Sequence, residues 1–148
     1  MFSGGVDSTG VLHRVLTHQD YADYKIYVHH IHIVNRENRA KAENISVNKI
    51  IGYYKNNCSR EFDFFYSTFN LSGIQSVRTK RFPFDMDVCA FMAANICAAR
   101  PEIVNVAMGR TKTDVSSGGS NFSLRMNRAQ AIFKSTLSLE RRGVCFPF

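Results

Sequence analysis

Seven residues near the start of the chain have the types and the spacing to bind a phosphate group. They are Ser3, Gly4, Gly5, Val6, Asp7, Ser8 and Thr9, here called the Gly-Gly loop. Adjacent glycines allow backbone angles closed to other residues and let a ligand approach the main chain. A helix that begins directly after them would present free N–H groups and the positive end of its dipole to a phosphate. The hydroxyl groups of Ser3, Ser8 and Thr9 would add further donors.

The carboxylate of Asp7 is the informative member of this loop. Bound phosphates would repel it unless a divalent cation lay between them, so Asp7 indicates a Mg²⁺ ligand. The loop is not a P-loop of the Walker type, because no Gly-Lys-Ser/Thr follows, and the GxGxxG pattern of dinucleotide-binding folds is absent. The competing interpretation is an ordinary helix N-terminus, in which Asp7 or a serine caps the helix and the glycines form a turn.

The elements that would position the Gly-Gly loop alternate between helices and strands. Apolar spacing predicts helices over 8–18, 37–56, 85–99 and 124–138, with Asn35 and Asp85 as candidate caps. Composition and alternation predict strands over 25–34, 61–69 and 102–109, and a polar loop over 111–123. This order predicts an α/β fold, a Rossmann-like parallel sheet with helices on both faces. Ligands in such sheets bind at the carboxyl ends of the strands, so the Gly-Gly loop and the segments after Val34 and Met108 should open onto one edge.

The Gly-Gly loop also resembles a known phosphate-binding motif. Ser-Gly-Gly-Val-Asp-Ser-Thr is similar to the pyrophosphate-binding loop of the PP-loop ATP pyrophosphatases, or adenine nucleotide alpha hydrolases. Within that superfamily the chain looks most like the 7-cyano-7-deazaguanine synthases, loosely and over roughly residues 2–135. Shorter likenesses surround Glu43, Arg81, and the pair Gly109 and Asp114.

The resemblance implies an ATP-dependent, AMP-forming ligase. Such an enzyme adenylates a carboxylate or carbonyl of a deazapurine-type substrate of the queuosine pathway, releases pyrophosphate and forms a carbon–nitrogen bond. The Gly-Gly loop would cradle the pyrophosphate and Asp7 would bind Mg²⁺. Asp7, Ser8 and Arg81 would act in catalysis, and His32, Gly109 and Asp114 would contact the nucleotide. A tRNA-thiolating or other amidotransferase-type PP-loop enzyme, or a non-catalytic nucleotide-binding module, are the alternatives.

The ends of the chain depart from this family pattern. Only Met1 and Phe2 precede the loop, where the family has a complete first strand, and the chain stops at Phe148. The family continues there with a Pro-Leu segment, a lysine and a four-cysteine zinc site. We therefore expect one nucleotide-binding domain, residues 1–148, shortened at both ends.

Composition narrows the class of protein further. A net charge of +7, from 19 basic and 12 acidic residues, favours anionic partners, but the basic residues are dispersed, so a nucleic-acid site and a solvated basic surface both remain open. No apolar run approaches the roughly 20 residues that cross a bilayer, and no secretory signal begins the chain, so a cytoplasmic protein is expected.

An incomplete sheet edge would invite homo-oligomer formation. Cys89 and Cys97 are expected as buried free thiols.

Three histidines in the segment 25–34 invite a metal hypothesis. In a strand His30 and His32 share one face while His29 points to the other, so at most two could converge. Packed or edge-strand histidines are the competing interpretation. The resemblance implies a third, in which His32 or its neighbours line the adenine pocket, because superfamily members contact adenine at the end of this strand. The helix 85–99 is expected to bury Val88, Phe91, Met92 and Ile96 and to turn Asp87 toward solvent.

Overall fold

The computed structural model describes residues 1–35, 38–75, 85–109 and 119–137. The chain divides into two compact units, Met1–Phe82 and Pro83–Phe148. The first unit contains the Gly-Gly loop and a small parallel sheet. The second consists, in its described part, of two helices and an irregular segment between them.

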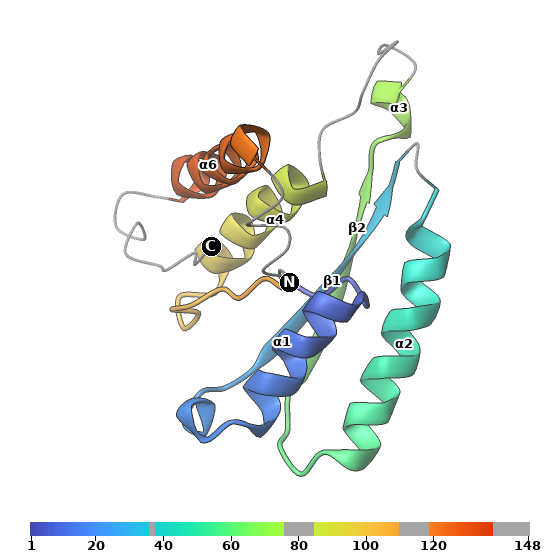
Figure 1. The fold of residues 1–148 in the computed structure, drawn as a ribbon, viewed down its shortest axis with the longest axis vertical. Coiled ribbons are helices and arrows are strands. Elements are labelled where there is room, and N and C mark those ends of the chain that lie inside the picture. The colour runs from blue at the N-terminus through green and yellow to red at the C-terminus, as the bar shows by residue number, and fades with distance from the viewer. Residues whose placement is uncertain (36–37, 76–84, 110–118, 138–148) are drawn as a thin grey trace. The chain divides into compact units, whose positions relative to one another are not determined.

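The sheet of the first unit is formed by two parallel strands. Strand β1 (Tyr27–Val34) pairs with β2 (Asp63–Asn70), with Tyr27 opposite Asp63 at one end and Val34 opposite Asn70 at the other. Helix α2 (Ala40–Asn57) connects them, which gives the β-α-β unit visible in Figure 1. The strands predicted over 25–34 and 61–69, and their parallel pairing, are confirmed. Both strands run in the same direction because a long crossover helix, and not a tight turn, joins them.

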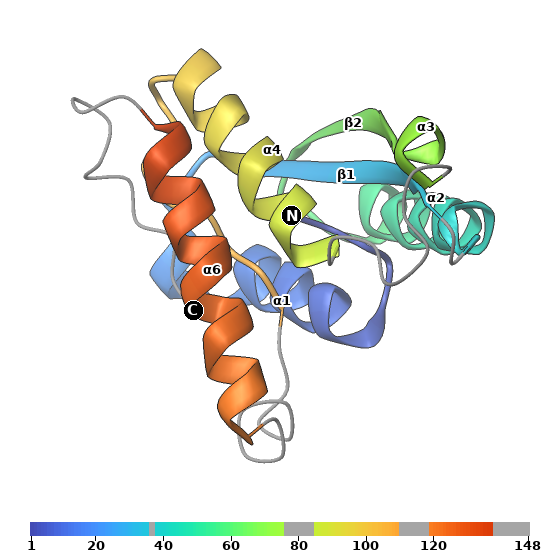
Figure 2. The ribbon, with the colours of Figure 1, turned by 90° about the horizontal axis from the view of Figure 1, so that it is seen from above.

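The core of the first unit lies between one face of this sheet and two helices. Helix α1 (Val6–Thr17), followed by the short helix η1 (Gln19–Tyr21), and helix α2 lie on the same side of β1 and β2, as Figure 2 shows. The buried residues that pack together are Phe2, Leu12, Leu16, Val28, Val47, Ile51 and Tyr54. Those in α1 and α2 recur at helical spacing, so each helix buries an apolar stripe. The apolar spacing that predicted α2 is only partly buried, because it includes Ile45, which is 50% exposed.

The segments that follow β1 and β2 show two features that the sequence did not predict. The predicted Asn35 cap of α2 is wrong, because the helix begins at Ala40 with Arg39 at the N-cap position and no side-chain cap. The chain reaches the helix through Asn38, whose φ of 54° lies in the left-handed region that asparagine tolerates. After β2, a single helical turn, α3 (Ser72–Gln75), follows the buried Leu71.

The second unit pairs α4 (Asp85–Ala99) with α6 (Gly119–Thr136), which pack on each other. The helix over 85–99 is confirmed at both ends, whereas α6 begins inside the polar stretch 111–123. Phe91 was expected to be buried and is 42% exposed. The fully buried positions are instead small residues of α4 and two residues of α6: Ala90, Ala93, Ala94, Cys97, Ala129 and Phe133. Small side chains let two helix backbones approach closely, so packing selected the alanine face over the bulkier one.

One acidic side chain and one thiol of α4 also differ in exposure from the sequence-based prediction. Asp87 does not face solvent; its side chain is 15% exposed and forms an ion pair with Arg128 of α6, with Nη2 of Arg128 2.7 Å from Oδ2 of Asp87. Cys97 is buried and Cys89 is half-buried, and both are free thiols. The expectation of buried free thiols is therefore confirmed for Cys97 and met in part by Cys89.

The segment after α4 does not form the expected strand. Residues 102–109 are irregular apart from an isolated bridge at Asn105, and Val104 is 55% exposed while Val106 is buried. A strand needs a continuous ladder to a neighbouring strand as well as a suitable composition. The chain thus has an α/β architecture with a parallel two-stranded sheet. No helix in the described ranges is both long and apolar enough to cross a membrane.

Candidate functional site

The Gly-Gly loop is held against helix α2 by its first glycine. Gly4 has a φ of 74°, which only glycine adopts without strain. The hydroxyl of Ser46 donates a hydrogen bond to the Gly4 carbonyl oxygen at 2.7 Å. A Cβ on Gly4 would lie 2.9 Å from Cγ2 and 3.0 Å from the backbone nitrogen of Val47. The fold itself therefore requires glycine at this position.

The hydroxyl groups of the loop are engaged in hydrogen bonds within it. Ser8, which is 7% exposed, donates from Oγ to the Gly5 carbonyl at 3.1 Å and accepts from the Ser3 N–H at 3.3 Å. Oγ1 of Thr9 donates to the same Gly5 carbonyl at 2.8 Å. Contact between Ser8 and a phosphate would require its hydroxyl to exchange the bond to Gly5 for one to the ligand. In its present geometry Ser8 holds the loop in shape.

The second glycine and the first turn of α1 form the open part of the loop. Gly5 is exposed at the N-cap with a φ of −82°, and the nearest atom to an added Cβ would be Oγ of Ser3, at an ordinary 3.5 Å. No side chain caps α1. Asp7 lies in the first turn and is half-buried, and its carboxylate makes no hydrogen bond or ion pair with the described residues. Uncapped N–H groups and the helix dipole at this end provide an anion-binding geometry.

A hydrogen-bonded network of two histidines and an asparagine lies behind the loop. Nδ1 of His30, a residue only 4% exposed, is 2.9 Å from the carbonyl oxygen of Phe2. Its Nε2 is 2.8 Å from Oδ1 of Asn44 in α2, and Nδ2 of Asn44 is 2.7 Å from Nδ1 of His32. His29 points the other way, with Nε2 3.0 Å from Oγ of Ser67. The predicted division of the three histidines between the two faces is confirmed, and both ring nitrogens of His30 are occupied by protein partners.

The remaining predicted site residues have different locations. His32 is half-buried near the carboxyl end of β1, in the same unit as the loop. Gly109 ends the irregular segment of the second unit. Arg81 and Asp114 lie outside the described residues. The structure therefore brings together the loop, His30 and His32 with residues of α2, and it leaves the predicted roles of the other three residues as predictions.

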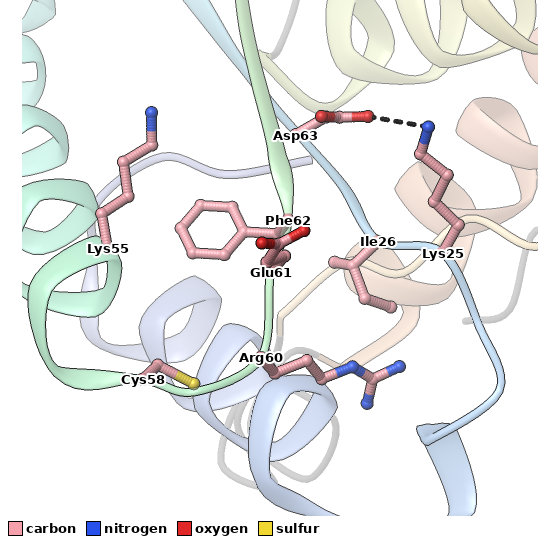
Figure 3. Close-up of a pocket in the computed structure, with 8 residues that line it drawn as sticks. All are labelled: Lys25, Ile26, Lys55, Cys58, Arg60, Glu61, Phe62 and Asp63. Carbon is pink, nitrogen blue, oxygen red and sulfur yellow. Dashed lines mark ion pairs between the residues drawn. The ribbon is translucent and has the colours of Figure 1, made fainter.

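A separate cavity of about 500 Å³ lies where the two strands begin, not where they end (Figure 3). Lys25 and Lys55 line two of its sides, and Lys25 forms an ion pair with Asp63 at 3.2 Å. The hydrogen bond to the Asp63 carboxylate raises the pKa of Lys25 above its ordinary value. Arg60 donates to the carbonyl oxygens at the end of α1 and around η1, those of Val15, Tyr21, Ala22 and Tyr24. Among the described residues, none predicted for nucleotide binding lines this cavity.

Sequence reasoning missed the residues of α2 that support the loop. Ser46 and Asn44 were not among the candidates, although Asn44 begins the stripe that continues with Val47, Ile51 and Tyr54. A polar residue at the start of an apolar helical stripe is a usable signal, because it must find a partner when the stripe is buried.

Comparison with known proteins adds no family assignment to this geometry. No protein-family model matches the chain, and neither the curated proteins nor the solved structures give a match.

Proposed function

We propose that the Gly-Gly loop binds the pyrophosphate portion of Mg²⁺-ATP, and that the chain is an ATP-dependent, AMP-forming ligase of the PP-loop type. The observation that carries this proposal is the contrast between its two glycines. The fold requires Gly4, because of its positive φ and its contact with Val47. It does not require Gly5, which has an ordinary φ and room for a side chain. Gly5 lies next to an uncapped helix N-terminus. A ligand that approaches the main chain there would explain why this position is a glycine although the fold does not need one.

The electrostatics of the loop support a phosphate with a metal ion. The N-terminus of α1 favours negative charge, and Asp7 supplies a carboxylate oxygen there without a protein partner among the described residues. Mg²⁺ is commonly held by one or two carboxylates together with substrate phosphates and water, so this single carboxylate fits the ion. Bound there, Mg²⁺ would neutralise charge on the phosphate oxygens. Asp7 would orient the ion, and the N–H groups of the loop would bind the leaving pyrophosphate.

The proposed reaction joins a carboxylic acid to ammonia and consumes ATP. A carboxylate oxygen of the acceptor attacks the α-phosphorus, the bond to the bridging oxygen breaks, and pyrophosphate leaves with that electron pair. Ammonia then attacks the acyl carbon, and AMP leaves. Donors placed where charge develops on the leaving group accelerate such a step. The resemblance of the loop and of the segments around Glu43, Arg81, Gly109 and Asp114 to the 7-cyano-7-deazaguanine synthases supports a deazapurine carboxylate as the acceptor.

Calorimetric titration with Mg²⁺-ATP tests the binding step. The wild type should bind, and Gly5→Ala should keep its melting temperature yet lose affinity by about tenfold or more, since a methyl group would occupy the space of a phosphate oxygen. Gly10→Ala is the matched control, because it adds the same methyl group further along α1, where nothing lies within 4 Å. Asp7→Asn should weaken binding in the presence of Mg²⁺ more than in its absence.

A pyrophosphate-release assay with ATP, a carboxylated deazaguanine and ammonia tests the chemistry. Pyrophosphate release that requires both ATP and the deazaguanine, and that continues beyond a single turnover only when ammonia is also present, supports the ligase. Binding without release, with this acceptor and with others, would instead favour a non-catalytic nucleotide-binding module. No binding of ATP by the folded wild type would overturn the proposal.

A further inference from the structure

We propose that His30 and Asn44 are positioning residues of the Gly-Gly loop, which they connect to His32 near the end of β1. The proposal rests on the proposed function insofar as it names pyrophosphate as the ligand of the loop. Its structural part, the orientation of the loop by a buried histidine, can be tested without any ligand.

The contact between His30 and Phe2 determines where one proton lies. A carbonyl oxygen can only accept, so Nδ1 of His30 must carry hydrogen to bond the Phe2 oxygen at 2.9 Å. Two arrangements of the Asn44 amide satisfy the rest of the network. In one, His30 donates from both nitrogens to Phe2 and to Oδ1 of Asn44, and is then cationic. With the amide turned by half a rotation, Asn44 donates to a neutral His30. The Nδ1–H donation to Phe2 is common to both.

Phe2 is the residue from which the loop departs, and both of its main-chain groups are held by β1. Its N–H donates to the carbonyl oxygen of His29 at 2.8 Å, and its carbonyl accepts from His30. Two residues after Phe2, the carbonyl oxygen of Gly4 accepts a hydrogen bond from the Ser46 hydroxyl. The Phe2–Ser3 and Gly4–Gly5 peptide units are thereby fixed, which sets the direction of the N–H groups of Ser3 and Gly5. A loop ordered before binding does not have to be ordered by its ligand, and affinity rises accordingly.

Asn44 extends this support to the end of the strand. Its amide bridges Nε2 of His30 and Nδ1 of His32, a half-buried side chain that we propose near the adenine. The loop for the phosphates and the residue for the base therefore share one hydrogen-bonded network. A polar network of this kind is stable when each member is satisfied, and removal of one member leaves a buried partner without a bond.

Nuclear magnetic resonance of the wild type tests the proton position. Long-range proton–nitrogen correlation of the imidazole rings should show His30 with hydrogen on Nδ1, either as that neutral tautomer or as the cation. A neutral His30 protonated on Nε2 alone would overturn the proposal, because it could not donate to Phe2. This measurement needs no variant and no nucleotide.

Variants of His30 test the positioning of the loop. His30→Leu removes the donor, and we expect hydrogen exchange at the Ser3 and Gly5 amides to become faster and pyrophosphate affinity to fall by about tenfold, as for the loss of one buried hydrogen bond. His30→Asn keeps an amide N–H near the position of Nδ1 and should restore most of the affinity. His29→Leu is the matched control, because it changes a histidine of the same strand that points to the opposite face.

The outcomes separate the two proposals. Unchanged loop exchange and unchanged affinity in a folded His30→Leu protein would overturn the positioning role. If His30→Leu alters hydrogen exchange in the loop but the wild type binds no pyrophosphate, the positioning role is supported and the proposed function fails. If His30→Leu does not fold, Asn44→Ala, which keeps the His30 ring, should still accelerate exchange in the loop, and no change there would count against the proposal.

Discussion

A Cβ atom added to Gly4 would lie 2.9 Å from Cγ2 of Val47, a side chain that is itself only 1% exposed. Val47 belongs to the core between α1, α2 and β1, so it cannot move aside without disturbing its neighbours. The Gly-Gly loop and helix α2 are thus in direct contact through a glycine, and the shape of the loop depends on an element some 40 residues later in the chain.

Substitution of Gly4 should destabilise the protein. Gly4→Ala places a side chain at a φ of 74° and against the backbone nitrogen of Val47, so we expect the free energy of unfolding to fall by about 2 kcal/mol or more. Gly52→Ala, inside α2 with nothing within 4 Å, should instead raise it by about 0.5–1 kcal/mol. Urea denaturation of both variants measures the difference. Equal effects of the two substitutions would contradict the described path of the loop.

Arg60 should stabilise the end of α1 and the turn around η1. Its guanidinium donates to four backbone carbonyl oxygens, including that of Val15 at 2.8 Å and that of Tyr24 at 2.7 Å. We expect Arg60→Ala to lower the free energy of unfolding by about 2 kcal/mol, and Arg60→Lys by nearly as much, because an ammonium group lacks the planar fork. Lys55→Ala, at an exposed residue that lines the same cavity, serves as the control and should change stability by less than about 0.5 kcal/mol.

Tyr54 should make the protein sensitive to alkaline pH. Burial is the main cause that raises the pKa of Tyr54, and the ionised forms of Tyr53 and Cys58 add to it. Below about pH 10 the phenol of Tyr54 is neutral in both the folded and the unfolded chain. Above that pH the unfolded chain loses the proton first, because the folded pKa is higher. The free energy of unfolding therefore falls as pH rises toward the folded pKa. Tyr54→Phe should reduce this loss, whereas Tyr53→Phe, at a residue 62% exposed, should reduce it less, because it removes only the smaller contribution of the ionised Tyr53.

Urea denaturation at a series of pH values measures this difference between the two tyrosine variants. The comparison is made between variants because Lys25, whose pKa is also raised, acts in the same direction in all of them. An identical alkaline slope in wild type and Tyr54→Phe would show that Tyr54 does not contribute.

The ion pair between α4 and α6 should contribute measurably to stability. Arg128 contacts Asp87 through two nitrogens, at 2.7 and 3.1 Å, and the Asp87 side chain is largely shielded. In a double-mutant cycle with Asp87→Asn and Arg128→Gln we expect a coupling of about 0.5–1 kcal/mol, limited by the exposure of Arg128 and reduced by salt. The exposed pair of Arg100 and Glu102, 3.5 Å apart, should give almost none. A coupling no larger than that of the exposed pair would show that the two-nitrogen contact adds nothing.

Local sequence patterns determined the elements of the first unit and helix α4 of the second. Alternating β-branched and aromatic residues predicted β1 and β2, and apolar spacing predicted α1, α2 and α4 to within a few residues of their bounds. These predictions hold because propensity and the periodicity of the buried face are properties of neighbouring residues. The burial of Leu12 and Leu16 in α1, and of Val47, Ile51 and Tyr54 in α2, agrees with them. The Gly-Gly loop was recognisable for the same reason, since its seven residues are contiguous.

Contacts between distant segments decided the rest. The sequence could not distinguish Gly4 from Gly5, because the difference lies in the approach of Val47. It could not connect His30 to Phe2 and Asn44, which are 28 and 14 residues away. Composition favoured a strand over 102–109 and a bulky buried face for α4, but ladder partners and the close packing of α4 on α6 determine those features. Such choices depend on which surfaces meet in three dimensions, and a local pattern contains no information about its partner.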